Sequence, residues 1–278
     1  MKRVLLGTFC SILAVGVEAS EPTFDADLSL WGGYFDYEED HVDVSQKHDS
    51  VYGIGADLST DRSKKLYGTL SFDYEHTTSK TDDNDQTISY TQLAYIQHIG
   101  LADHSWAINP YLGYGVSKDN GDNDDDTMPY RFAGLGITKT IDKFEINGQL
   151  GMVDSDDNYG EAIENGVYGG LSVNYQLNDQ VALTGRMFGL KGDRDDDPTA
   201  AEAFDVAAGV EYSPSVHPVT FWANYDYSSY NPDESDTPNI SEVRIGLTYH
   251  FGNKEGITSR RYLPNIGRWM SLYMNEIE

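Results

Sequence analysis

The residues of this sequence best suited to bind an ion are aspartates at alternate positions within polar stretches. Three such runs occur, and together they contain Asp122, Asp124, Asp126, Asp154, Asp156, Asn158, Asp193, Asp195 and Asp197. Alternate oxygen ligands in a flexible loop suit a hard cation such as calcium. The glycine and the final glutamate of an EF-hand loop do not fall at the required positions. The spacing therefore predicts either a weak calcium site or ordinary solvated acidic loops.

Histidine is the side chain most often used for acid–base catalysis, and the chain has 7 of them. They are scattered, and none stands in a local grouping with serine or aspartate that indicates a catalytic centre. A Ser-His-Asp triad is defined by geometry rather than by sequence position, so one could still assemble in space. We predict that the chain is not an enzyme and has no organic cofactor. A lipid-modifying enzyme is the less favoured alternative.

A further set of charged residues lies in segments where apolar and polar residues alternate. The polar side of these segments carries ten acidic and two basic residues, which are Asp25, Asp27, Asp57, Asp73, Glu75, Glu145, Asp205, Glu211, Asp226, Glu242, Arg186 and Arg244. Acidic rings select cations in channels. If this side lines a pore, its excess of carboxylates predicts a preference for cations. The alternative is that Arg186 and Arg244 pair with neighbouring carboxylates and help to fill a narrow lumen.

The elements that must position these residues are predicted by the period of two, which is typical of strands with one apolar and one polar face. Twelve segments show it or come close to it, near 24–36, 51–59, 66–75, 88–98, 106–117, 129–139, 144–153, 166–177, 181–190, 203–212, 219–227 and 240–251. The segments 88–98 and 129–139 alternate poorly, so the side on which Arg131 and Lys139 lie stays open.

The connections between these segments also alternate, between long polar loops and shorter turns. The long loops are 38–50, 76–87, 118–128, 154–165, 191–202 and 228–239, and they hold 26 of the 46 acidic residues but only 5 of the 19 basic ones. One rim of long loops and one rim of short turns is typical of a bacterial outer-membrane barrel. A soluble β-sandwich would instead need Greek-key connections and buried inner faces. We therefore predict an all-β fold, a transmembrane up-and-down antiparallel β-barrel of about 12 strands.

The N-terminus has the three parts of a secretory signal peptide. Lys2 and Arg3 precede an apolar stretch at 4–17, and Ala19 supplies a small residue at the cleavage position. We predict that residues 1–19 are removed on export. No later stretch is apolar and long enough for a membrane helix, so any membrane span must be made of strands.

The composition excludes two other classes of protein. A formal net charge of -27 argues against binding to nucleic acid or to anionic membrane surfaces. Disorder is excluded because 20 tyrosines, 10 phenylalanines and 4 tryptophans are far too many aromatics for a solvated acidic chain.

Several aromatics fall on or near the ends of the predicted strands, where amphipathic rings would form the girdles of a membrane barrel. They are Tyr34, Tyr37, Tyr52, Tyr74, Tyr90, Trp106, Tyr130, Tyr212, Trp222, Tyr225, Tyr227 and Tyr249. An aromatic ladder that binds carbohydrate is the alternative.

The last predicted strand, 240–251, resembles the C-terminal assembly signal of Gram-negative outer-membrane proteins. It has a polar residue, then glycine two positions later, then aromatic or apolar residues that end in phenylalanine. The resemblance implies that Arg244, Gly246, Tyr249 and Phe251 are read by the barrel-assembly machinery. It also implies a porin-like barrel at residues 20–252, placed in the outer membrane among lipids and lipopolysaccharide. The chain departs from the pattern because 27 residues follow the phenylalanine, which usually ends the chain in that family.

Together these features predict a passive, cation-preferring pore for small solutes, of a subfamily that the motifs do not identify. The alternative is a structural or adhesive surface barrel whose loops bind divalent cations, which could bridge to lipopolysaccharide phosphates.

The tail at 253–278 is predicted to contain a short amphipathic helix on the periplasmic side. Its apolar residues follow helical spacing and are Ile266, Trp269, Met270, Tyr273, Met274 and Ile277. Such a short helix is unstable alone in water, so its apolar face must dock somewhere. Nearby basic residues favour the periplasmic mouth of an acidic barrel, and they are Lys254, Arg260, Arg261 and Arg268. The membrane interface and a periplasmic partner are the alternatives.

Overall fold

The protein is described here from a computed structural model. It describes residues 24–38, 48–60, 65–80, 85–101, 105–120, 125–155, 163–194, 200–231, 239–251 and 266–274. The predicted signal peptide at 1–19 lies outside these described residues.

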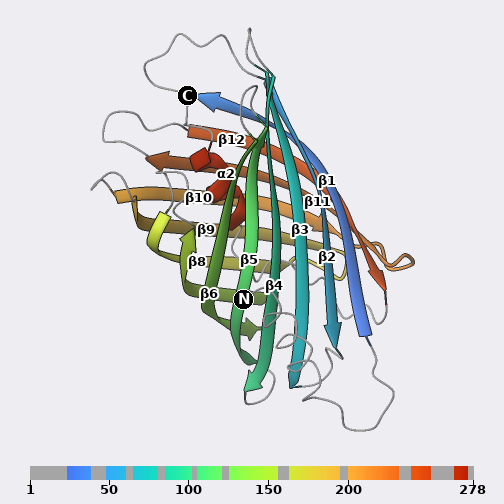
Figure 1. Cartoon of the computed structure of the whole chain (residues 1–278). Coiled ribbons are helices and arrows are strands. Elements are labelled where there is room, and N and C mark those ends of the chain that lie inside the picture. Colours follow the sequence, from blue (N-terminus) through green and yellow to red (C-terminus); the bar gives the residue numbers. More distant parts are fainter. Residues whose placement is uncertain are drawn as a thin grey trace.

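Twelve antiparallel strands form one closed barrel, in which each strand pairs with its neighbours in sequence and β1 pairs with β12 (Figure 1). The strands are β1 (Phe24–Glu38), β2 (His48–Thr60), β3 (Leu66–Lys80), β4 (Asp85–Leu101), β5 (Trp106–Asn120), β6 (Asp125–Ile141), β7 (Phe144–Ser155), β8 (Ile163–Gln176), β9 (Val181–Arg194), β10 (Ala200–Tyr212), β11 (Val219–Asn231) and β12 (Asn239–Phe251). The predicted fold class and strand number are confirmed. Among the described residues no helix is long and apolar enough to cross a membrane.

Most strands extend further into the predicted long loops than the alternation indicated. Lys80 pairs with Asp85 and Asn120 pairs with Asp125, so only 81–84 and 121–124 remain between these strands. The reason is that backbone hydrogen bonds continue the ladder beyond the point where apolar side chains stop. We call the end where β1 meets β2 the long-loop end, and the opposite end the short-turn end.

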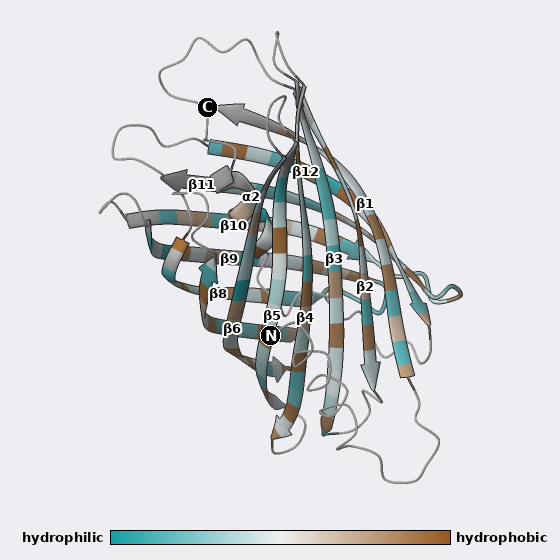
Figure 2. Ribbon diagram, viewed as in Figure 1, coloured by the Kyte–Doolittle hydropathy of each residue, from teal (hydrophilic) through white to brown (hydrophobic). Residues whose placement is uncertain are grey.

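Hydrophilic and hydrophobic residues alternate along many of the strands (Figure 2). The large apolar side chains are mostly exposed and many polar and charged side chains are buried, which is the reverse of a water-soluble protein. On β7, Leu150 and Met152 are 64% and 60% exposed, whereas Asn147 and Gln149 face the lumen and are buried. An apolar outer band is stable only against lipid, which is the arrangement of transmembrane barrels.

The short helix α2 (Ile266–Met274) lies inside the barrel, against β4, β5 and β6. Its wall neighbours Tyr90, Ser117 and Tyr130 all lie in the long-loop half of their strands. The predicted helix therefore exists, but its position differs from the expected one. We expected it at the short-turn mouth, where β12 ends, and it occupies the opposite half of the lumen.

Candidate functional site

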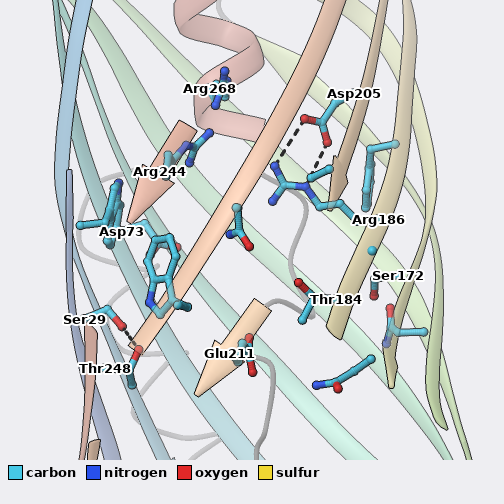
Figure 3. A pocket seen from close by; sticks show the side chains of 18 of the residues that line it. Ser29, Asp73, Ser172, Thr184, Arg186, Asp205, Glu211, Arg244, Thr248 and Arg268 are labelled. Carbon is cyan, nitrogen blue, oxygen red and sulfur yellow. Dashed lines mark hydrogen bonds and ion pairs between the residues drawn. The ribbon is translucent and has the colours of Figure 1, made fainter. Parts of the chain in front are cut away.

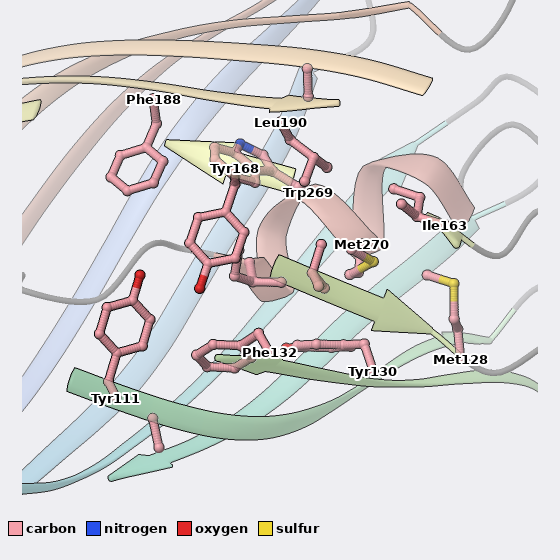
Figure 4. Packing of buried hydrophobic residues seen from close by; sticks show 14 of the residues in the cluster. Tyr111, Met128, Tyr130, Phe132, Ile163, Tyr168, Phe188, Leu190, Trp269 and Met270 are labelled. Atoms are coloured by element: carbon pink, nitrogen blue, oxygen red, sulfur yellow. The ribbon is translucent and has the colours of Figure 1, made fainter. Parts of the chain in front are cut away.

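The long-loop half of the lumen is filled by an apolar cluster around α2 (Figure 4). Ile266, Trp269 and Met270 are at most 3% exposed. The ring of Trp269 packs against Phe188 with 5.4 Å between centroids. The cluster is completed by wall residues, which include Met128, Tyr130, Phe132, Ile163, Tyr168 and Leu190. Burial of this much apolar surface stabilises the helix inside the barrel.

Two hydrogen bonds join the backbone of Gly267 to the wall. Its N–H donates to Oε1 of Gln92 at 3.1 Å, and its carbonyl accepts from the hydroxyl of Ser117 at 3.4 Å. The first N–H groups of a helix have no partner within the helix, so Gln92 acts as a cap supplied by the barrel. A Cβ at this position would collide with the rings of Tyr90 and Tyr130, so only glycine permits this close approach.

The wall that receives α2 explains why segments 88–98 and 129–139 alternate poorly. On β4 the lumen side carries Ile88, Tyr90 and Ile96, and on β6 it carries Met128 and Phe132, all of them buried. Both faces of these strands are thus largely apolar, one against lipid and one against the helix. This loss of alternation was the available signal for a lumenal docking surface, and our sequence reasoning did not use it. Arg131, whose side was left open, lies on the outer face and is exposed.

The predicted girdle is partly wrong. Seven of its rings are exposed on the outside of the barrel, namely Tyr34, Tyr52, Trp106, Tyr212, Tyr225, Tyr227 and Tyr249. Tyr90, Tyr130 and Trp222 instead point inward and are buried. Each of the inward rings Tyr130 and Trp222 lies flat against a glycine of the neighbouring strand, Gly115 and Gly246 respectively. The missing side chain of the glycine makes room for the ring against the wall of the barrel.

Below α2, toward the short-turn end, a buried network of charges crosses the lumen (Figure 3). The guanidinium of Arg244 lies 3.2 Å from Glu75, 2.5 Å from Glu242 and 3.9 Å from Asp226. Arg186 lies 3.1 Å from Asp205 and also pairs with Asp226. Arg244, Asp226 and Glu242 are at most 2% exposed, so these charges depend on one another for stabilisation.

The helix joins this network through Arg268, which pairs with Glu242. The network therefore contains four carboxylates and three guanidinium groups, one of which comes from the tail. The alternative that Arg186 and Arg244 pair with neighbouring carboxylates is the arrangement seen. The docking of Arg268 matches the expectation that basic tail residues face an acidic lumen.

Between this network and the short-turn end lies a polar cavity, bounded on one side by Arg268 and Trp269 of α2. Side chains from ten of the twelve strands line it. Its carboxylates outside the network are Asp57, Asp73, Glu145 and Glu211. Asp57 accepts a hydrogen bond from Ser71 at 2.6 Å. The remaining predicted lumen residues, Asp25 and Asp27, lie on the same inner face nearer the short-turn end.

A chain of hydrogen bonds crosses the seam between β1 and β12. Asp27 Oδ1 is 2.7 Å from Nδ1 of His250, whose Nε2 is 2.9 Å from the hydroxyl of Thr220. That hydroxyl is 2.6 Å from the hydroxyl of Ser213. These hydrogen bonds join β1, β12, β11 and the turn between β10 and β11, so they help to hold the barrel closed.

We predict that His250→Ala lowers the free energy of unfolding by about 1–3 kcal/mol, because buried polar partners lose a hydrogen bond. Urea unfolding of the barrel refolded in detergent, followed by tryptophan fluorescence, measures this change. The control is His217→Ala in an exposed turn, for which a change within about 0.5 kcal/mol is expected. Equal effects of the two variants would contradict the proposed role of the seam.

The aspartate runs considered for calcium lie mostly beyond the described residues. Six of the nine are outside them, and of Asp126 only the backbone is described. Asp154 pairs with Arg131, and Asp193 is exposed. Within the described part of the chain no group of three or more histidine, cysteine or acidic side chains is placed to hold a metal ion. The calcium site stays a prediction.

The four residues assigned to an assembly signal face two ways. Arg244 points into the lumen, and Gly246 lies beneath the ring of Trp222. Tyr249 and Phe251 are exposed on the outside, with 4.5 Å between ring centroids. Their recognition by assembly machinery stays a prediction.

Comparison with known proteins supports the architecture. No protein-family model and no curated protein sequence matches the chain. Among solved structures it is similar to an outer-membrane channel from Pseudomonas putida F1, with 9% identity and a TM-score of 0.59 over 85% of this chain and 98% of that one. It is also similar to the β-domain of the Bordetella autotransporter BrkA, with 11% identity and a TM-score of 0.50 over 81% and 99% of the two chains. The CymD monoaromatic hydrocarbon channel gives 9% identity and a TM-score of 0.50 over 83% and 89%. At these identities the likeness establishes the fold alone.

Proposed function

We propose that this chain, which has the fold of the bacterial outer-membrane β-barrels, is an outer-membrane channel for small solutes that its own C-terminal helix closes. The observation that carries the proposal is the polar cavity beneath α2, lined by ten strands. A barrel that serves only as an anchor needs no cavity in its lumen, because the side chains of its own strands can fill the lumen. The obstruction in the long-loop half is largely a helix from the tail, which can leave without disturbing any strand pairing.

We further propose that the open channel prefers cations. The described lumen side carries the ten predicted carboxylates against three guanidinium groups, those of Arg186, Arg244 and Arg268. Fixed negative charge in a pore raises the local concentration of cations and lowers that of anions. The lumen is less acidic than it would be with only the two strand arginines, Arg186 and Arg244, because the tail adds the guanidinium of Arg268.

The test is the reversal potential of the barrel lacking residues 253–278 in a planar bilayer under a potassium chloride gradient. The sign expected is that of potassium preference. Replacing Glu145 and Glu211 together by glutamine should lower the ratio of potassium to chloride permeability on the order of twofold. Glu202→Gln on the outer surface, where Glu202 pairs with Lys191, is the matched control and should leave the ratio unchanged. Chloride preference, or no conductance from folded barrel, contradicts the proposal.

Hydrolysis is a second candidate function, favoured by the order Asp27, His250, Thr220 at hydrogen-bond distances. This is the order of a catalytic triad with threonine as the nucleophile. It ranks second because Thr220 is only 6% exposed and because the neighbouring backbone belongs to a paired ladder, which leaves no obvious oxyanion hole. Release of fatty acid from phospholipid by the folded protein, lost in Thr220→Val and retained in Thr248→Val, would favour it over the channel.

A further inference from the structure

We infer that the cavity beneath α2 binds an organic cation of the alkylammonium or quaternary ammonium class. The inference rests on the proposed function, because it names the class of solute that the channel would take. It is carried by two tryptophans, by the carboxylates beside them and by a buried acceptor on the opposite wall.

Trp31 and Trp222 form the aromatic part of the site. Both line the cavity, and their ring centroids are 6.4 Å apart. Gly246 stands between them in the sheet, since it pairs with Trp31 on β1 and with Trp222 on β11. The ring of Trp31 lies against Gly53 and that of Trp222 against Gly246, so each ring lies along the wall of the cavity.

The orientation of Trp31 is fixed by a hydrogen bond from its Nε1 to Glu75 at 3.0 Å. A ring held in this way offers a π-face to the lumen without having to be ordered by the ligand. Tryptophan is the aromatic side chain that attracts cations best, and quaternary ammonium groups are commonly recognised by such faces.

Carboxylates flank this pair of rings on both sides. Glu211 on β10 is the direct partner of Trp222 on β11. Asp73 on β3 pairs with Gly55 on β2, and β2 is the strand next to β1, which carries Trp31. Both residues line the cavity. The arginines that line it, Arg186, Arg244 and Arg268, are engaged with network carboxylates. The wall around the tryptophans is therefore net negative, which excludes an anion as the preferred ligand.

A buried acceptor on the opposite wall also points to a ligand. Asn147 lines the cavity and is 3% exposed, and its amide nitrogen donates to Thr138 at 2.8 Å. Its Oδ1 has no hydrogen-bond partner within the described part of the chain. An unpaired buried acceptor is costly, and an N–H or O–H group of a bound cation would satisfy it.

The ligand is organic rather than a metal ion for two reasons. Across the described residues no cluster of three or more acidic or histidine side chains is arranged for a metal. The indole faces also contribute apolar surface, which a hydrated inorganic ion does not use and which alkyl groups on nitrogen do.

The test uses the full chain refolded in detergent micelles and titrated with choline chloride, read by tryptophan fluorescence. The matched ligand is 3,3-dimethylbutan-1-ol, which has the shape of choline but no charge. Choline should give a saturable change and bind about tenfold more tightly than the neutral alcohol. Sodium chloride at equal ionic strength controls for screening.

Two variants locate the site. Asp73→Asn with Glu211→Gln, which keeps the shape of both side chains, should weaken choline binding about tenfold and leave binding of the alcohol unchanged. Trp106→Phe, on the outer surface, should leave choline binding as it is. Folding of each variant is checked by the gel shift of the unheated barrel. Equal binding of choline and the alcohol, or no saturable binding to folded protein, overturns the inference.

This experiment is independent of conduction, because it uses the closed full chain. If choline does not bind but the shortened barrel conducts, the channel stands and the organic-cation site fails. If choline binds but no form of the barrel conducts, the site stands and the channel proposal fails.

Discussion

Removal of residues 253–278 is expected to raise the single-channel conductance on the order of tenfold or more, from an occluded to a steady open pore. The reason is that α2 and its apolar cluster fill the long-loop half of the lumen, whereas the strands close the barrel without the tail. Planar-bilayer recordings of the full and shortened chains measure the change. If the shortened, folded barrel conducts no better than the full chain, the helix is not a plug and the structural or adhesive barrel becomes the better hypothesis.

A point substitution tests the same closure with the whole chain present. Gly267→Val places a side chain where the rings of Tyr90 and Tyr130 stand, so the helix should leave its position and the conductance should rise toward that of the shortened barrel. The matched control is Gly148→Val on β7, because no atom lies within 4 Å of a Cβ built there. If the pore stays closed in Gly148→Val and opens in Gly267→Val, the opening is caused by loss of the helix from its position.

The expelled helix has little reason to remain folded. It has nine residues, fewer than an isolated helix needs for stability in water. Its stability comes from burial of Ile266, Trp269 and Met270, and from the polar contacts of Gly267 and Arg268. Order in the tail and closure of the lumen are therefore coupled, and either one reports on the other.

The architecture could be predicted because each strand is a local pattern. Alternation along segments such as 144–153 reflects lipid on one side and lumen on the other, and both environments act on every residue of the strand. The strand ends were predicted less well, because hydrogen bonds of the backbone extend the ladder through polar residues such as Lys80 and Asp85.

The position of the helix could not be predicted from its own sequence. An amphipathic helix specifies an apolar partner without specifying which surface that partner is. The missing information lay in other strands, where Tyr90, Tyr130 and Phe132 make the lumen side apolar. Such a surface is visible only when distant segments are considered together, because the strands β4 and β6 that form it lie more than 100 residues before α2 in the sequence.

The polar lumen residues were identified by periodicity, but their partners were not. Glu75 and Arg244 are 169 positions apart in the sequence and 3.2 Å apart in the barrel. Pairing of this kind depends on the stagger of twelve strands, which a sequence pattern does not determine. The lumen was accordingly predicted as more uniformly acidic than it is.

The second large effect is expected from Arg244, since it neutralises three carboxylates in the middle of the lumen. Arg244→Met should lower the free energy of unfolding by about 3–5 kcal/mol, because Glu75 would lose the guanidinium it pairs with, and Asp226 and Glu242 would keep only Arg186 and Arg268 respectively. Urea unfolding in detergent measures the change without the assembly machinery, so a role of Arg244 in the assembly signal cannot contribute.

Arg131→Met is the matched control for this experiment. Arg131 also pairs with a carboxylate, that of Asp154, but its side chain is 78% exposed on the outer surface. An exposed pair of this kind contributes less than about 1 kcal/mol. Adding Glu242→Gln to Arg244→Met should recover part of the lost stability, because it removes one of the carboxylates that Arg244 stabilises. The size of the recovery measures the coupling between Arg244 and Glu242. Equal losses for Arg244→Met and Arg131→Met, or no recovery in the double variant, would mean that the buried charges are stabilised by something other than this guanidinium.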